Sequence, residues 1–263
     1  MAPLNGVAGA ALAVCVMLKV YPAFLLAYLL VRRRWRALVA CLGGMVLLQL
    51  LTLAVFGVHE NQVFFLRILP HMLGESSVIG AENLGMGRYA QDLLGVEPAT
   101  AKRFAQAVTL LLLAAALCAV ERNRRRGRGR ELVGPELALF VALMVFSLPN
   151  SWVNYQLLLL IPYLVLLARA AEEGAAWGSR LGGLAAAGAF LLLFYAPCAD
   201  PAVVNWPCAE TPRFLGLLQL PRGFHDAMVS LRVLASLLPV LVLIGLLHRE
   251  AASRGASSAG GKP

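Results

Sequence analysis

The stretch LNGVAGAALAVCVMLKVYPAFLLAYLLVRRRWR, residues 4–36, decides the fold class of this chain. Its first 28 residues are almost entirely apolar, and a run of arginines follows at once. A helix needs about 20 apolar residues to cross the roughly 30 Å hydrocarbon core of a bilayer. The stretch therefore predicts a transmembrane helix, Leu4–Val31, that ends at a charged membrane surface.

Six further apolar segments follow along the chain. Of the 263 residues, 60% are hydrophobic and 14% are charged, so a water-soluble domain would expose too much apolar surface. No alternation with a period of two occurs, which favours helices over a barrel. We therefore predict an all-α polytopic membrane protein with about seven transmembrane helices in one domain, residues 1–250, and a disordered cytoplasmic tail, residues 251–263. The predicted spans after the first are Trp35–Gly57, Phe104–Val120, Leu132–Leu148, Tyr155–Ala170, Leu181–Ala196 and Met228–Leu247.

The basic residues are distributed unevenly between the two sides that these spans define. Fifteen lysines and arginines follow the odd-numbered spans, against six in the longer loops on the other side. Positive residues favour the cytoplasmic side, so the pattern predicts a cytoplasmic C-terminus and, with seven spans, an N-terminus outside the plasma membrane. Because no signal peptide or outer domain precedes Leu4, we expect an N-terminal portion of the fold upstream of this chain. The arginine runs carry no stacking aromatics, so no nucleic-acid partner is predicted.

The five cysteines fall into two groups. Three lie inside apolar spans and are expected to be small core residues: Cys15, Cys41 and Cys118. Cys198 and Cys208 lie in the last outer loop, where an oxidising environment permits a disulfide, and whether they pair is left open. His59, His71 and Glu75 lack the tight spacing typical of metal ligands. No cofactor is predicted, and metal dependence is left open.

Lys19 is the clearest polar residue inside a predicted span. It lies twelve residues before Val31, which is about 18 Å along a helix and near mid-depth. Pro22 is expected to kink the helix beside it. Polar side chains in lipid are costly and therefore indicate a functional position. Two interpretations stay open: a cation facing an internal cavity, where it would meet a phosphate, and a lysine near the outer interface of a long, tilted helix.

The largest predicted segment outside the membrane is the outer loop at 58–103. Apolar residues recur at helical spacing in both of its halves, so two short helices lying on the membrane surface are expected. Its acidic, amide and arginine side chains suit the hydroxyls and phosphate of a ligand, and equally an ordinary solvated loop. In the turn at 149–156, Trp152 and Tyr155 are placed as interfacial anchors or as a platform for a sugar ring. Gln49 and Glu136 are expected to be polar residues of helix packing.

Three short motifs resemble glycosyltransferase family 87, a family of the GT-C class of polytopic transferases that use polyprenol-phosphate sugars. The first is Leu18-Lys19-Val20-Tyr21-Pro22, running into Arg32-Arg33-Arg34-Trp35-Arg36. The second joins Arg67-Ile68-Leu69-Pro70 to Glu82-Asn83, where family members often continue with Gln-Ser and this chain has Leu84-Gly85. The third is Ser151-Trp152-Val153-Asn154-Tyr155, in which Asn154 replaces a frequent histidine. The resemblance covers most of residues 4–170.

The resemblance implies a multi-pass membrane hexosyltransferase, of a class that includes mannosyltransferases, working at the outer face of the plasma membrane. Its partners would be membrane lipids, a polyprenyl-phosphate-linked sugar as donor, and a glycan or glycolipid acceptor. The family's catalytic acid lies in an outer loop upstream of the part that resembles this chain, so no catalytic residue is assigned. The resemblance implies substrate binding for these candidates: Lys19, Tyr21, Arg67, Glu82, Asn83, Arg88, Trp152, Asn154 and Tyr155.

Three alternative functions stay open. A flippase or transporter of lipid-linked sugars would need polar residues toward both faces, whereas those of this chain gather toward the outer one. An inactive truncated remnant, or a membrane scaffold, would result if the catalytic loop were absent. A seven-span receptor is disfavoured because no receptor motif is present. Transfer of labelled sugar from a polyprenyl carrier separates an enzyme from all three.

Overall fold

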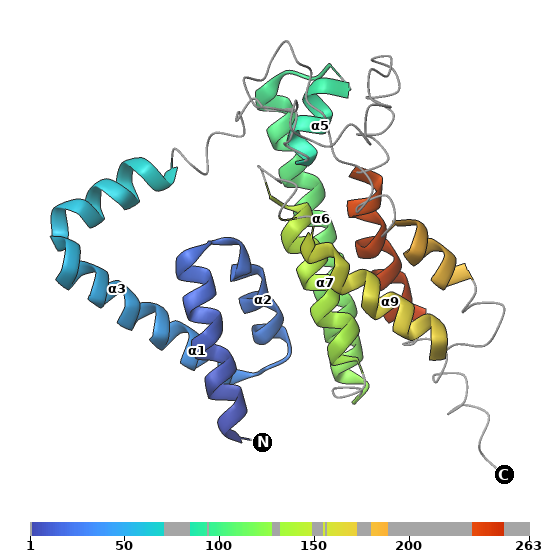
Figure 1. Cartoon of the computed structure of the whole chain (residues 1–263), viewed down its shortest axis with the longest axis horizontal. Coiled ribbons are helices and arrows are strands. Elements are labelled where there is room, and N and C mark those ends of the chain that lie inside the picture. Colours follow the sequence, from blue (N-terminus) through green and yellow to red (C-terminus); the bar gives the residue numbers. More distant parts are fainter. Residues whose placement is uncertain are drawn as a thin grey trace, which may run out of the picture. The chain divides into compact units, whose positions relative to one another are not determined.

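The computed structural model describes residues 2–70, 85–93, 95–127, 132–148, 155, 157–172, 180–188 and 233–249. Within these ranges the chain is helical apart from short turns and has no β-strand, which confirms the all-α prediction for this part of the molecule (Figure 1). The chain divides into two compact units. Unit 1 comprises Met1–Glu75, Leu111–Met144 and Leu243–Pro263, and unit 2 comprises Ser76–Leu110 and Val145–Val242.

Two described helical segments are long and apolar enough to cross a membrane, judged by length and composition: Trp35–Ile68 and Pro98–Arg125. Shorter apolar helices cover Gly6–Leu18, Tyr21–Val31, Val133–Phe146 and Val233–Arg249. Helix α6 (Pro98–Arg125) includes residues 98–103, which were predicted to belong to the outer loop. The number of spans and the membrane side of each loop stay predictions, and the tail at 251–263 lies outside the described residues.

The prediction of one helix over Leu4–Val31 is wrong. The chain instead forms helix α1 (Ala2–Leu18), a 3-10 turn η1 (Tyr21–Ala23) and helix α2 (Phe24–Val31). Pro22 lies in η1 and has no backbone N–H, and in a continuous helix its ring would clash with the carbonyl of the residue four positions earlier. The chain therefore breaks here rather than kinking, and α2 turns back beside α1 (Figure 1).

Helices α1 and α3 (Trp35–Val63) pack closely through small residues and run parallel. Gly9 faces the backbone of Ala37, and a Cβ added to Gly44 would lie 2.8 Å from the Cβ of Ala13. Small residues let helix backbones approach closely where lipid offers no hydrophobic drive for association. Because the contacts advance in the same direction along both helices, α2 is a return segment between two parallel helices.

Helix α2 ends in a Schellman motif that reverses the chain into α3. The N–H of Arg33 donates to the carbonyl of Leu30 at 3.0 Å, and the N–H of Arg34 donates to the carbonyl of Leu29 at 2.9 Å. Arg33 has a φ of 53°, at the position where such motifs usually carry glycine. Arg33 and Arg34 are exposed, whereas Arg32 is buried. The arginine run is thus divided between a charged surface and the interior of unit 1.

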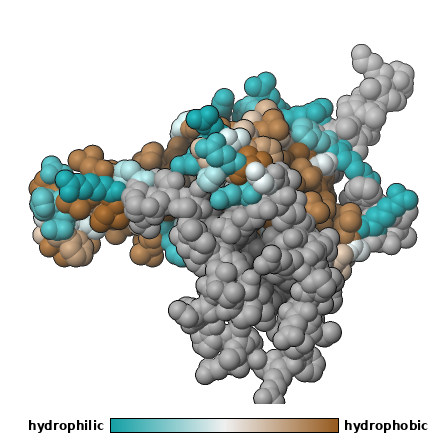
Figure 2. Space-filling model, turned by 90° about the horizontal axis from the view of Figure 1, so that it is seen from above, coloured by the Kyte–Doolittle hydropathy of each residue, from teal (hydrophilic) through white to brown (hydrophobic). Residues whose placement is uncertain are grey.

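The outer surface of α3 is largely apolar. Val46 and Leu47 are 60% and 68% exposed, and further exposed leucines and valines surround them. Figure 2 shows hydrophobic residues interspersed with hydrophilic ones over the helical part of the chain at the left of the view. Exposed apolar side chains along a helix of this length suit contact with lipid tails.

Unit 2 is built from helix α5 (Met86–Leu93), the first part of α6, the short turn η3 (Leu157–Leu159), helix α9 (Leu160–Glu172) and the helical segments at 180–188 and 233–242. The hydroxyl of Tyr163 donates a hydrogen bond to the carbonyl of Ala235. Gly188 packs against the same tyrosine ring so closely that a Cβ would overlap it. One buried tyrosine therefore joins three helices of this unit.

Candidate functional site

A sharp kink in α3 creates the candidate site. Gly57 has φ 83° and ψ 171°, a conformation open essentially to glycine alone. The helix from Trp35 to Gly57 is about 33 Å long at 1.5 Å per residue, close to the thickness of a bilayer core. Beyond Gly57 the chain changes direction, passes through a π-helical turn η2 (Phe64–Ile68) and remains helical to residue 70.

Asn61 stabilises this kink by replacing backbone hydrogen bonds that the break removes. Its Nδ2 donates to the carbonyl of Gly57 at 2.8 Å and to that of Thr52 at 3.3 Å. Its Oδ1 accepts a hydrogen bond of 2.9 Å from Nε2 of Gln49. One amide thus connects the part of α3 before Gly57 with the part after it, and we call these parts the two legs of α3. The contact forms because carbonyls freed at a kink need other partners.

A pocket of about 290 Å³ lies where the two legs of α3 meet the end of α1. Small-molecule pockets begin at about 300 Å³, so this one has room for a compact group. We call it the kink pocket, and its lining residues are Met17, Gln49, Thr52, Phe56, Glu60, Asn61, Phe64 and Phe65.

The chemistry of the kink pocket combines apolar walls, amides and one carboxylate. Glu60 is the sole ionisable residue of the lining, and within the described ranges it has no hydrogen bond or ion pair. Phenylalanine rings and a methionine form most of the wall. An unpaired carboxylate beside amides can accept hydrogen bonds from hydroxyl groups, whereas it repels a phosphate. The lining therefore suits the hydroxyl groups and apolar face of a sugar ring.

Three predicted site residues belong to unit 1 and lie within four residues of a lining residue along the chain. Lys19 is exposed and follows the lining residue Met17 by two positions, at the break between α1 and η1. Tyr21 begins η1 and is half-buried. Arg67 lies in η2, two residues after the lining residue Phe65. None of these three residues belongs to the pocket lining, and their link to the kink pocket is their position along the chain, so their role in binding stays a prediction.

The other predicted site residues are not part of this arrangement. Arg88 belongs to α5 in unit 2, where the structure describes its backbone only, and Tyr155 is a half-buried residue of the same unit. The remainder lie outside the described residues: Glu82, Asn83, Trp152, Asn154, Cys198 and Cys208. The disulfide and the third motif therefore stay predictions.

The described cysteines and acidic residues form no candidate metal centre. Among the described residues, no three histidine, cysteine, aspartate or glutamate side chains are grouped to hold a metal ion. Cys41 is buried as predicted, but Cys15 and Cys118 are exposed on the surface of the chain, so the prediction of core positions is wrong for these two.

Sequence reasoning missed the role of four polar residues of the kink pocket. Thr52 was not singled out, and Glu60 and Asn61 were placed in a loop rather than on a helix that folds back on its neighbour. Gln49 was expected only to pack helices, yet it both lines the pocket and binds Asn61. A usable signal was present: an isolated glycine in an apolar run, followed within four residues by a carboxylate and an amide.

The comparisons with known proteins agree with the resemblance drawn from the motifs. The sequence pattern of glycosyltransferase family 87 matches residues 2–149, which is more than half of the chain. The matched region contains α1, α2, α3 and the whole kink pocket, and it ends before the turn that begins at Ser151. No curated protein and no solved structure matches the chain. On the strength of the matched pattern, this chain belongs to glycosyltransferase family 87.

Proposed function

We propose that this chain transfers a hexose from a polyprenyl-phosphate carrier to a glycan or glycolipid acceptor at the outer face of the plasma membrane. Membership of a glycosyltransferase family supports the transfer chemistry. The observation that carries the proposal is the kink pocket, which a free carboxylate, two amides and aromatic rings line, and whose lining residue Met17 precedes Lys19 by two positions in the sequence.

The parallel course of α1 and α3 supports a revised orientation. The start of α1 packs beside the start of α3, and the exposed Arg33, Arg34 and Arg36 belong to that same end. The preference of positive residues for the cytoplasm then places the start of α1 inside, in place of the outer N-terminus predicted from seven spans. Lys19 and the kink pocket belong to the opposite end, on the proposed outer side.

The charges around the pocket suggest how the donor would bind. The sugar ring would occupy the kink pocket and donate hydroxyl hydrogen bonds to Glu60, because that carboxylate excludes the phosphate. Lys19 and Arg67 would take the phosphate and stabilise its charge as it leaves. The acceptor oxygen would bond to the anomeric carbon as the bond from that carbon to the phosphate oxygen breaks. The acceptor proton would pass to a carboxylate base that we leave unassigned.

Transfer of radiolabelled hexose in membrane vesicles tests this proposal. Vesicles containing the full chain would receive polyprenyl-phosphate hexoses, mannose among them, and label entering the acceptor fraction would be measured. We expect Lys19→Met to lower kcat/KM by about 100-fold, because it removes a cation from the leaving phosphate. We expect Glu60→Gln to raise KM for the donor about tenfold, since it weakens hydroxyl binding.

A matched control and the alternative functions complete this test. Glu121→Gln neutralises a carboxylate that lies away from the pocket lining and should leave transfer unchanged. Unchanged transfer in Lys19→Met would remove the phosphate role of this lysine. Movement of intact lipid-linked sugar between leaflets without any transfer would instead establish a flippase.

A further inference from the structure

Helix α2 needs a polar anchor, because lipid alone cannot hold it in place. With η1 it covers eleven residues, Tyr21–Val31, which is about 18 Å and too short to cross a bilayer. Lipid tails are as apolar as leucine, so burial of its leucines does not fix its depth. Whatever holds α2 against its neighbours in unit 1 also sets the position of the turn that carries Lys19 and Tyr21.

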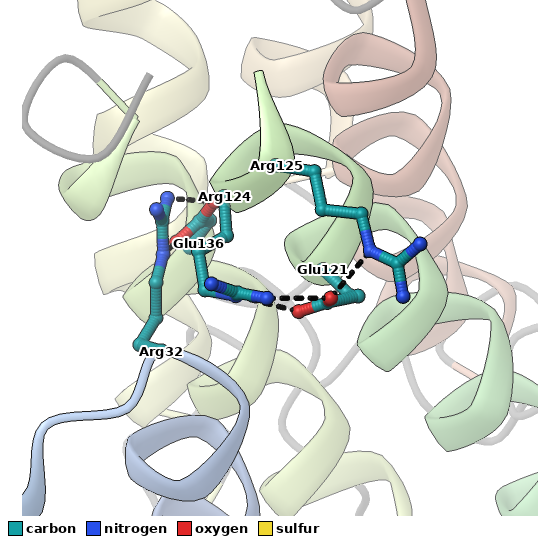
Figure 3. Close-up of polar contacts among 5 residues, drawn as sticks. All are labelled: Arg32, Glu121, Arg124, Arg125 and Glu136. Carbon is teal, nitrogen blue, oxygen red and sulfur yellow. Dashed lines mark hydrogen bonds and ion pairs between the residues drawn. The ribbon is translucent and has the colours of Figure 1, made fainter. Parts of the chain in front are cut away.

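Two contacts attach α2 to helix α7 (Val133–Phe146), and we call them the α2–α7 clamp. Arg32 at the end of α2 forms a bidentate ion pair with Glu136 in the first turn of α7, with Nε 2.6 Å from Oε2 and Nη2 bonded to Oε1 (Figure 3). One turn away on each helix, the rings of Tyr28 and Phe140 lie 5.4 Å apart. The contacts run in opposite directions along the two helices, so α2 and α7 are antiparallel.

Because the ion pair is buried, we expect its main effect to be on how α2 is aligned along α7 rather than on the stability of the fold. The side chains of Arg32 and Glu136 are 3% and 0% exposed. Replacing a buried ion pair by apolar residues of similar volume is often neutral or stabilising, and the best-attested use of such a pair is to fix the alignment of the elements it joins. The planar guanidinium of Arg32 donates hydrogen bonds to both carboxylate oxygens of Glu136, and this bidentate geometry is lost if α2 slides along α7 by a single residue.

A third buried polar residue adds to the penalty for misalignment. Asn123 of α6 is 0% exposed, and neither of its side-chain amide atoms has a hydrogen-bond partner within the described ranges. It lies beside the Glu136 carboxylate together with Tyr28. Unit 1 therefore gathers an arginine, a glutamate and an amide in its interior, where any shift of α2 would leave further polar groups unpaired.

We propose that Arg32 and Glu136 are positioning residues, whose ion pair fixes the depth of the Lys19–Pro22 turn, which begins two residues after the pocket-lining Met17. The turn lies at the far end of a short rigid helix from Arg32, so a displacement at the clamp is passed on to Lys19 and Tyr21. This inference rests on the proposed function where it concerns substrate binding, but the position of the turn is independent of that function.

The experiment removes the ion pair without leaving a lone buried charge. In the double variant Arg32→Met, Glu136→Leu, the apolar pair supports folding but imposes no fixed register. The matched control, Arg124→Met with Glu121→Leu, removes a half-exposed pair in the same way. The full chain is assayed in sealed vesicles for donor KM. A second readout is the labelling rate of Val20→Cys by a membrane-impermeant maleimide, in a background in which the native cysteines are replaced.

The two readouts separate positioning from structure. We expect the clamp variant to remain folded, with donor KM raised about tenfold and the labelling rate of residue 20 changed, while the control shows neither effect. Unchanged KM and labelling in the clamp variant would overturn the proposal. Loss of the folded protein in that variant alone would also overturn it, since the role would then be structural. If the unaltered chain transfers no hexose, the proposed function fails and the labelling rate alone decides the positioning.

Discussion

The described residues of unit 1 include two arginine–glutamate clusters with nearly identical bonds and very different surroundings (Figure 3). Arg32 and Glu136 lie 104 residues apart in the sequence and have almost no exposed side-chain surface. In the second cluster, Glu121 binds Arg124 one turn later through two bonds of 2.7 Å, and their side chains are 30% and 25% exposed. Arg125 adds a further bond of 2.7 Å to the same carboxylate.

The comparison shows that bond geometry does not by itself set the importance of an ion pair. Water screens the Glu121 cluster, and its partners are neighbours on one helix whether or not the rest of the molecule folds. Removal of either partner from the buried pair leaves a charge in an apolar interior. The Glu121 cluster therefore adds only contacts between neighbouring turns at the end of α6, whereas the buried pair joins two distant segments of the chain.

The largest effect should come from leaving one buried charge unpaired. Glu136→Gln is expected to lower the free energy of unfolding by about 3–5 kcal/mol, because Arg32 keeps its charge without a carboxylate. Thermal unfolding in detergent, followed by tryptophan fluorescence, measures the loss. A variant as stable as the original chain would show that water reaches this pair.

A smaller effect on stability is expected when the positive charge at residue 32 is kept but the planar guanidinium is removed. Arg32→Lys should lower the free energy of unfolding by about 1–2 kcal/mol, since an ammonium cannot bind both carboxylate oxygens in the same way. The matched change Arg124→Lys should leave the unfolding temperature unchanged. Equal losses in the two variants would contradict the distinction between the clusters.

The neighbouring arginine should respond in the opposite direction. Arg33→Gly is expected to raise the free energy of unfolding by about 1 kcal/mol, because glycine adopts the left-handed conformation of this Schellman position without strain. The same unfolding measurement detects the gain. A loss of stability would mean that the side chain of Arg33 makes a contact that outweighs the strain of its backbone.

The smallest effect belongs to the half-exposed cluster. Glu121→Gln should leave the unfolding temperature of the full chain within experimental error, and raising the salt concentration should remove any remaining difference. A clear loss of stability that persists at high salt would place this carboxylate in a less solvated environment than its exposure indicates.

Much of the fold was predictable because a segment that crosses lipid must be a long, apolar helix. The apolar segments around Leu47, Leu112 and Leu139 were identified as helices, and the structure has helices there. The break at Pro22 was predicted as a kink and not as a reversal, since a proline signals interrupted hydrogen bonding without giving the direction of the chain that follows. Direction came from the packing of α1 against α3.

The candidate site was predictable only in part for a related reason. Lys19, Tyr21 and Arg67 were identified from a resemblance to family motifs, and each lies within four residues of a pocket-lining residue along the chain. Glu60 and Asn61 were not identified as site residues. Their role depends on the backbone angles of Gly57, which fold the second leg of α3 over the first.

The sequence by itself determined that the chain suits lipid surroundings, that it is helical and which family it belongs to. Apolar composition, the hydrogen-bonding needs of a chain in lipid and short motifs are all local properties of the chain. The sequence also determined the Glu121 cluster, whose partners lie three and four residues apart. Only the tertiary structure decided that α2 is a return segment, that Arg32 is buried against Glu136, and that Glu60 faces a pocket with Met17. These three features join residues distant along the chain, and their pairing depends on packing that no local pattern encodes.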